Sequence, residues 1–119
     1  MAMKNGCGFQ PLVVVRVWRG VVPKEKSAEY LEYLKRTGAK DYASTPGNLG
    51  ATILMRNRRK TTEFVVISRW NSLEDIRNFA GAKVDSARYY PRDRKFLLKL
   101  EPKVKHYDVA FESQKGRAA

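Results

Sequence analysis

The single histidine of the chain is the first residue that could act as a general base. His106 lies in the alternating segment KVKHYDVAF, so on a β-strand its side chain shares a face with Asp108. An imidazole has a reference pKa near neutrality, and a neighbouring carboxylate can orient it. This pair predicts a general base, with a hydrogen-bonded, purely structural His106 as the favoured alternative.

Arginine and aromatic residues lie in and near the predicted elements, where they could line a pocket. Guanidinium groups can hold an anionic oxygen, and indole and phenol rings form apolar walls that also donate hydrogen bonds. For Trp70, at a strand end beside a helix cap, packing is the favoured interpretation. The candidates are the cations Arg16, Arg69 and Arg88 and the aromatic residues Trp18, Trp70, Phe79, Tyr89 and Tyr90.

Two pairs among these candidates also have structural interpretations. Arg16 and Trp18 share one face of a predicted strand, so they could stack on each other. Tyr89 and Tyr90 precede Pro91, and one of them could line the pocket while the other packs. The spacing leaves both questions open.

Four segments have the β-branched composition or the alternation of strands. Within the first, Val13, Val15 and Val17 lie on one face, opposite a face that contains Arg16 and Trp18. Neither face suits plain exposure to water, which predicts a strand covered on both sides. The four predicted strands are residues 12–19, 49–56, 62–70 and 103–111, with a hairpin loop at 57–61.

Two helices are predicted between these strands. The first covers residues 23–38, because Pro23 suits an opening turn and Gly38 suits a helix end; turn chemistry follows over 41–48. The second begins at the capping residue Ser72, and residues 84–98 continue mainly as helix with a break at Tyr90-Pro91. The buried stripe of the second helix is predicted to contain Leu73, Ile76, Phe79 and Ala80.

The resulting order, β-α-β-β-α-β, is that of an α+β ferredoxin-like domain. Such a domain has an antiparallel sheet with helices packed on one face. The other face of this sheet also carries apolar residues and must be covered. A second copy of the chain is the economical cover, so the sequence predicts a homodimer.

The composition fits one domain in a reducing compartment. With 119 residues, we expect a single domain over 12–111 between flexible ends at 1–11 and 112–119. The single cysteine, Cys7, is interpreted as an incidental thiol, and no Cys/His spacing predicts a metal site. No apolar run has the length of a membrane span, and no signal peptide is apparent, which favours the cytoplasm.

The formal charge of +12 raises the question of nucleic-acid binding. The basic residues are spread along the chain, and the tight cluster at 56–60 is interpreted as a solvated loop or, second, as an anion-steering patch. An RNA-recognition motif needs a glycine and several aromatic residues on its third strand, whereas this strand begins KTTEFVVI. Nucleic-acid binding is therefore disfavoured.

Three runs resemble the antibiotic biosynthesis monooxygenase family, with the likeness covering roughly residues 12–111. They are RWNSLEDIRNFAG at 69–81, ARYYPRD at 87–93 and VKHYDV at 104–109. The resemblance implies a dimeric α+β barrel, in which two sheets close on each other, and a cleft between helices and sheet. Some members of the family oxidise phenolic polyketides with molecular oxygen and no cofactor, others degrade haem, and many have no assigned reaction.

The chain lacks residues that both the haem-degrading and the phenol-oxidising members use. Phe79 and Tyr89 stand near the positions of the Trp and the iron-binding His of the haem-degrading members, and the Asn of their first strand is absent. Haem is therefore disfavoured, although a tyrosine can ligate haem iron. The phenol-oxidising members use an Asn near the Trp-bearing strand, and residues 63–69 contain none.

We therefore expect a cofactor-independent, monooxygenase-like protein that acts on a small aromatic or otherwise apolar oxygenated substrate. The alternative is a dimer without catalysis that binds a small ligand or has a structural role. The expected catalytic residues are His106 and Tyr89. The expected substrate-binding residues are Arg16, Trp18, Trp70, Phe79, Arg88 and Tyr90.

Overall fold

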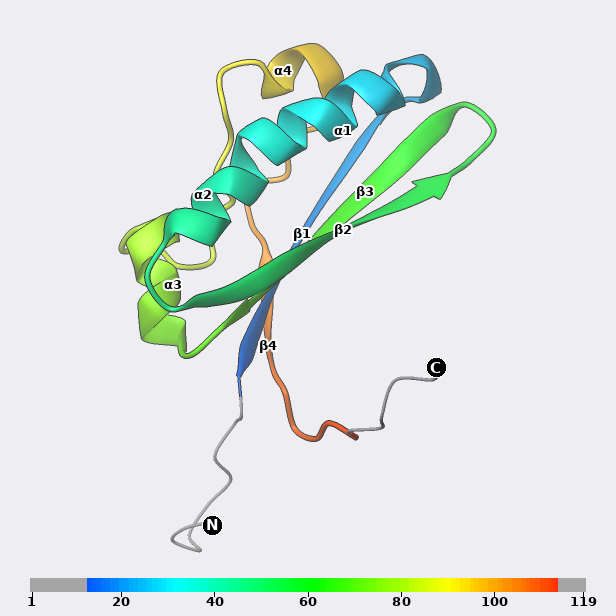
Figure 1. Cartoon of the computed structure of the whole chain (residues 1–119). Coiled ribbons are helices and arrows are strands. Elements are labelled where there is room, and N and C mark those ends of the chain that lie inside the picture. Colours follow the sequence, from blue (N-terminus) through cyan, green and yellow to red (C-terminus); the bar gives the residue numbers. More distant parts are fainter. Residues whose placement is uncertain (1–12, 114–119) are drawn as a thin grey trace, which may run out of the picture.

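The computed structural model describes residues 13–113, and its centre is a four-stranded antiparallel sheet (Figure 1). The strand order is β2-β3-β1-β4, which together with the helices between the strands is the predicted ferredoxin-like α+β plan. The long central pair β1 and β3 is in register from Val14 opposite Trp70 to Pro23 opposite Thr61. The strands are β1 (Val14–Pro23), β2 (Asn48–Asn57), β3 (Thr61–Trp70) and β4 (Lys105–Asp108).

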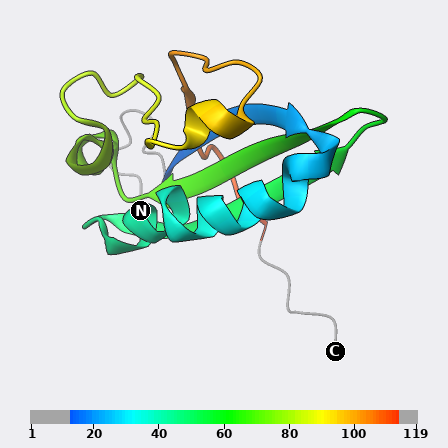
Figure 2. The same ribbon diagram turned by 90° about the horizontal axis from the view of Figure 1, so that it is seen from above.

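The helices pack on one face of this sheet, as Figure 2 shows by looking down onto them. The cap of α3 is the predicted one, because the Ser72 hydroxyl accepts a hydrogen bond from the backbone N–H of Asp75. No helix in the described part of the chain is both long enough and apolar enough to cross a membrane. The helical elements are the 3-10 turn η2 (Lys24–Lys26), α1 (Ser27–Arg36), α2 (Gly38–Ser44), α3 (Leu73–Ala80) and α4 (Asp93–Phe96).

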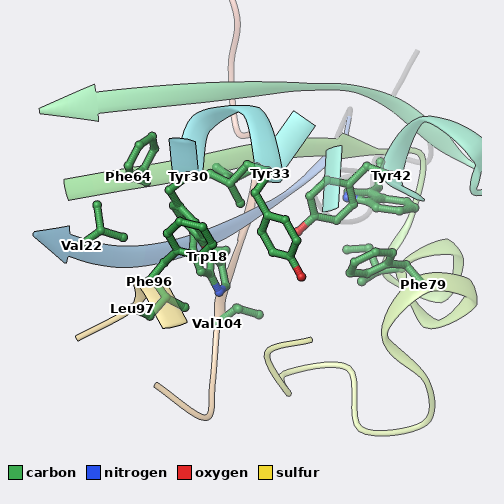
Figure 3. Packing of buried hydrophobic residues seen from close by; sticks show 14 of the residues in the cluster. Trp18, Val22, Tyr30, Tyr33, Tyr42, Phe64, Phe79, Phe96, Leu97 and Val104 are labelled. Atoms are coloured by element: carbon green, nitrogen blue, oxygen red, sulfur yellow. The ribbon is translucent and has the colours of Figure 1, made fainter. Parts of the chain in front are cut away.

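The core lies between the helices and the covered face of the sheet and is rich in aromatic rings (Figure 3). Tyr30 of α1 is fully buried, with its ring centroid 5.3 Å from that of Phe64 on β3 and 5.1 Å from that of Phe96 on α4. The ring centroid of Tyr42 on α2 lies 4.4 Å from that of Phe79 on α3. These contacts fix where α1, α2, α3 and α4 lie on the sheet.

The opposite face of the sheet is not covered by any described element. Its central positions are apolar but only partly buried: Val15 and Val17 on β1, and Val65 and Ile67 on β3. Leu54, opposite Val65 on β2, is 44% exposed. Within residues 13–113, therefore, β1 is covered on one face rather than on both as predicted.

The first predicted helix differs from the observed one. Helix α1 ends at Arg36, and Gly38 begins α2 instead of ending a helix, so residues 41–44 are helical and not part of a turn. The break is at Thr37, whose hydroxyl donates to the Tyr33 carbonyl and whose ψ of −92° leaves the helical region. A threonine that bonds its own helix in this way competes with the next helical turn.

The C-terminal third also departs from the sequence prediction. Within residues 84–98 only the short α4 is helical, since Ala87 and Val104 form backbone hydrogen bonds with Pro102 and Asp85 across a loop. The last strand is β4 alone and not the whole of 103–111. The predicted N-terminal tail 1–11, with Cys7, and residues 114–119 of the predicted C-terminal tail lie outside the described residues.

Candidate active site

A small pocket lies between the helices and the covered face of β1 and β3. Its walls are apolar and aromatic, with Trp18, Val66 and Phe79 among them, and its volume is about 30 Å³. That is room for about two water molecules. Three charged residues also line it: Arg16 from β1, Arg88 from the segment after α3 and Asp93 of α4. Asp41 lies outside the lining, where its carboxylate accepts a hydrogen bond from the Tyr90 hydroxyl.

Arg16 is the buried cation of the pocket, with 1% of its surface exposed. Its Nη1 and Nη2 donate to the carbonyl oxygens of Val84 and Ser86, each at 2.8 Å. Its guanidinium carbon lies 5.4 Å from the centre of the Phe79 ring, so the predicted stack of Arg16 on Trp18 is replaced by one on Phe79. The Arg16 Nε is buried and has no hydrogen-bond partner among the described residues. A buried unpaired donor is costly, which makes it a good place for a ligand oxygen.

His106 lies behind Arg16 and is not among the residues that line the pocket. Its Nε2 is 3.2 Å from Arg16 Nη1, and its Nδ1 is 3.1 Å from the Oδ1 of Asp85. The predicted partner Asp108 is replaced by Asp85, because the loop after α3 folds back over β4. Burial, and next the charge of Arg16, lowers the pKa of His106 below its ordinary value. His106 is therefore neutral at physiological pH.

Asp93 is a buried carboxyl on the opposite wall, 3% exposed. Its Oδ1 accepts a hydrogen bond from the Tyr30 hydroxyl at 2.8 Å, and its Oδ2 accepts one from the backbone N–H of Tyr90 at 2.5 Å. Burial raises the pKa of Asp93, and the two hydrogen bonds only partly oppose this shift. Burial, followed by the charge of Asp93, likewise raises the pKa of Tyr30. A carboxylate with a raised pKa is a stronger base than one in water.

Arg88 stands at the solvent end of the pocket, where its side chain is 45% exposed. Its guanidinium carbon lies 4.8 Å from the centre of the Phe79 ring and 5.3 Å from that of Tyr90. Asp41 of α2 holds both residues: its Oδ2 is 3.5 Å from Arg88 Nη2 and accepts a hydrogen bond from the Tyr90 hydroxyl. Burial, with this hydrogen bond, raises the pKa of Tyr90. Arg88 and Tyr90 thus close the pocket toward solvent.

Five of the six predicted substrate-binding residues line the pocket, whereas Trp70 and two further candidates, Tyr89 and Arg69, lie elsewhere. Trp70 is fully buried, donates from its indole Nε1 to Ser68 Oγ at 2.9 Å and packs on Tyr42. The Tyr89 hydroxyl donates to the Glu101 carbonyl, while its ring meets Trp18 edge-on. Arg69 reaches the Leu49 carbonyl on the exposed side of the sheet. The pocket residues are Arg16, Trp18, Phe79, Arg88 and Tyr90.

Sequence reasoning did not find the acidic groups of this site. Asp93 follows Pro91 in a segment that resembles an ordinary exposed turn, and Asp41 and Asp85 lie in polar stretches. Nothing local in the sequence marks Asp93 as buried, because its burial depends on the packing of α4 against α1.

Comparisons with known proteins agree with this architecture. The sequence profile of the family described as antibiotic biosynthesis monooxygenase matches residues 11–83. No curated protein sequence matches the chain.

Among solved structures, a Nitrosomonas europaea protein that carries the same family description superposes with a TM-score of 0.61 at 22% identity, covering 90% of this chain and 99% of the other. The haem-degrading protein MhuD from Mycobacterium tuberculosis, solved with two haems in its active site, has a TM-score of 0.57 at 20% identity, covering 85% and 99%. The cofactor-independent oxygenase SnoaB from Streptomyces nogalater has a TM-score of 0.51 at 19% identity, covering 88% and 98%. At these identities the likeness shows the fold alone.

Proposed function

Because the chain belongs to the antibiotic biosynthesis monooxygenase family, we propose that it oxidises a small aromatic substrate that carries a phenolic or enolic oxygen, using molecular oxygen and no bound cofactor. One observation carries this proposal. The aromatic-walled pocket is lined both by Arg16, a buried cation whose Nε has no hydrogen-bond partner among the described residues, and by Asp93, a carboxyl whose pKa is raised. A base and an oxyanion holder are the two groups that deprotonation of a phenol requires.

In this scheme Asp93 accepts the substrate's phenolic proton, and Arg16 stabilises the resulting oxyanion. The electron-rich anion then reduces dioxygen directly. For an anthrone, a ring methylene becomes a carbonyl: one oxygen atom enters the product, and the other leaves as water with the two hydrogens. His106 does not touch the substrate, and Tyr89 packs against Trp18.

Substrate entry needs a rearrangement, because a cavity of about 30 Å³ is smaller than an aromatic ring system. The groups that must move are Arg88 and Tyr90, which are held at the solvent end by the Asp41 carboxylate. Opening of a loop before chemistry is common in enzymes that exclude water.

Haem is not needed in this proposal. The chain has a single histidine, and both of its ring nitrogens already have partners, in Arg16 and Asp85. One solved relative in fold is a haem degrader, so the haem branch should be tested directly with haemin. A Soret shift that saturates at one or two haems per chain would contradict this part of the proposal.

A second candidate function is ligand binding or a structural role without chemistry. The observation that favours it is the small volume of the pocket, which the protein's own side chains nearly fill. Turnover distinguishes the two candidate functions, because only the proposed oxidation consumes oxygen.

We also propose that two copies pair through the open face of the sheet, where Val15, Val17, Val65 and Ile67 are only partly buried. A single-chain apolar face of this kind is the usual mark of an interface. The single cysteine is in keeping with a reducing compartment such as the cytoplasm, where we expect the protein to act.

The proposed oxidation is tested by measuring oxygen uptake with a panel of anthrones and quinols. We expect turnover by the wild type, and a loss in kcat of about 10²-fold or more in Asp93→Asn and in Arg16→Lys. Arg36→Lys, an exposed arginine on α1, is the matched control and should keep full activity. Turnover unchanged in Asp93→Asn would remove Asp93 as the base, and no turnover with any substrate would favour the binding role.

A further inference from the structure

The charge of Arg16 is compensated in an unusual way. Among the described residues no carboxylate lies within ion-pair distance of its guanidinium, although the side chain is almost fully buried. Removing a cation from water without a counter-ion is expensive. Its partners are two backbone carbonyls, the face of Phe79 and the imidazole of His106.

The imidazole can satisfy Arg16 in only one protonation state. Arg16 Nη1 is always a donor, so the facing His106 Nε2 must carry its lone pair. The ring proton then sits on Nδ1 and donates to the Asp85 carboxylate. Asp85 thereby fixes the tautomer of His106. Its negative carboxylate also polarises the imidazole, which makes Nε2 a stronger hydrogen-bond acceptor for Arg16.

His106 and Asp85 line a different cavity from Arg16. This second cavity is an open cleft beside β4, which Lys103, Lys105 and Tyr107 also line. Arg16 lines the inner pocket and not this cleft. The imidazole, whose side chain is 10% exposed, contacts Arg16 but does not line the inner pocket, so it would act on a ligand there through Arg16.

We propose that His106 is a positioning residue for this pocket: as a neutral acceptor whose tautomer is fixed by Asp85, it holds Arg16 so that the unpartnered Nε–H is presented to the anionic oxygen of the ligand. This inference rests on the proposed function for the nature of the ligand. It assigns to His106 a role that is neither that of a base nor that of an iron ligand. The lowered pKa of His106 supports the neutral state on which the arrangement depends.

The first measurement is the protonation of the imidazole, which is unambiguous because the chain has one histidine. In protein without a histidine tag, the ¹⁵N shifts at pH 8 should show the proton on Nδ1. Asp85→Ala should lose this preference, because the Nδ1 acceptor is gone. A proton on Nε2 in the wild type would overturn the proposal.

The second measurement is the affinity for 2,4-dinitrophenolate at pH 8, determined by calorimetry. His106→Ala should weaken binding about tenfold or more, because a hydrogen bond to a charged group is lost. His106→Gln should stay within about threefold of the wild type, since its amide oxygen can replace Nε2 as the acceptor. Lys103→Ala, in the same outer cleft, is the matched control and should also stay within about threefold.

Each outcome of these measurements either supports or overturns the proposal. Equal binding by His106→Ala and the wild type would overturn the proposal, as would His106→Gln as weak as His106→Ala, or a wild type that does not bind the phenolate. If His106→Ala fails to fold, Asp85→Ala takes its place and should weaken binding in the same direction. Phenolate binding with the expected pattern but without oxygen consumption would refute the proposed oxidation and leave this inference standing.

Discussion

On the helix side of the sheet, the carboxyl of Asp93 is buried beside Tyr30, whereas on the open side Glu63 lies between Arg19 and Arg58. Burial raises the pKa of Asp93, but the hydrogen bond from Arg19 lowers the pKa of Glu63. The same chemical group is thus made a stronger base on one side and a weaker base on the other. This difference is why the proposed acid–base chemistry is assigned to the helix side, where burial weakens the solvation of a charged carboxylate.

The apolar side chains of the two faces differ in a parallel way. Phe64 and Val65 are neighbours on β3, yet Phe64 is fully buried under α1 while Val65 is only partly buried. The helix side is therefore covered within the described residues, whereas the open side is left uncovered by them and is where the proposed second copy would pack.

The largest expected effect is a difference in stability between variants of these two neighbours. Phe64→Ala should cost about 3–5 kcal/mol of unfolding free energy, because it leaves a cavity among Tyr30 and the β1 side chains. Val65→Ala should cost about 1 kcal/mol or less in dilute protein. Urea unfolding at two protein concentrations is the measurement. If the cost of Val65→Ala grows with protein concentration, the open face is an interface; equal costs for the two variants would break the comparison.

The elements of this fold were predictable where local chemistry decides. Strands β2 and β3 and the Ser72 cap of α3 match the sequence prediction, because alternation and a capping hydroxyl act over a few residues. The split between α1 and α2 was not predictable, since it follows from the single side-chain hydrogen bond of Thr37. The mostly irregular 84–98 segment is set by backbone bonds to the distant 102–104 region.

The site was predictable in its walls and not in its acid–base groups. Arg16, Trp18 and Phe79 could be identified because a cation and large rings on covered faces are conspicuous in a sequence. Asp93 and Asp85 could not, because their importance comes from partners more than 20 residues away: Tyr30 for Asp93 and His106 for Asp85.

A smaller effect tests how tightly the helix side is filled. A Cβ at Gly20 would lie 2.5 Å from the Trp18 ring and 2.7 Å from a Leu97 methyl, so Gly20→Ala should destabilise by about 1–3 kcal/mol. Gly38→Ala is the control: its Cβ meets nothing closer than 3.9 Å, and alanine favours the helix that begins there. Thermal unfolding followed by circular dichroism measures both. A harmless Gly20→Ala would show that the helix side can yield, which would weaken its contrast with the open side.

The pH dependence of stability sharpens the contrast between the carboxyls. The folded pKa of Asp93 is raised above its usual 3.8, so its contribution to stability is fully present below that pH and is lost as the pH rises through the folded pKa. Asp93→Asn removes this dependence. We therefore expect the unfolding free energy of the wild type, relative to that of Asp93→Asn, to fall as the pH is raised from acid. A relative stability that rises with pH would mean that the carboxylate is better stabilised in the fold than its burial implies.

The smallest effect is expected at Glu63, on the open side, and it has the opposite sign. Its folded pKa lies below the usual 4.5, so its contribution is present above that pH and is lost as the pH falls through the folded pKa. Arg19 is 46% exposed, which screens the pair, so Glu63→Gln should cost only about 0.2–1 kcal/mol at neutral pH and nothing in strong acid. Urea unfolding from neutral to acid pH, in high and low salt, measures this cost. High salt should shrink it if the face is wet, but should leave it unchanged if a second copy shields Arg19 and Glu63. The same experiment therefore reports whether the open face is exposed to water in the assembled protein.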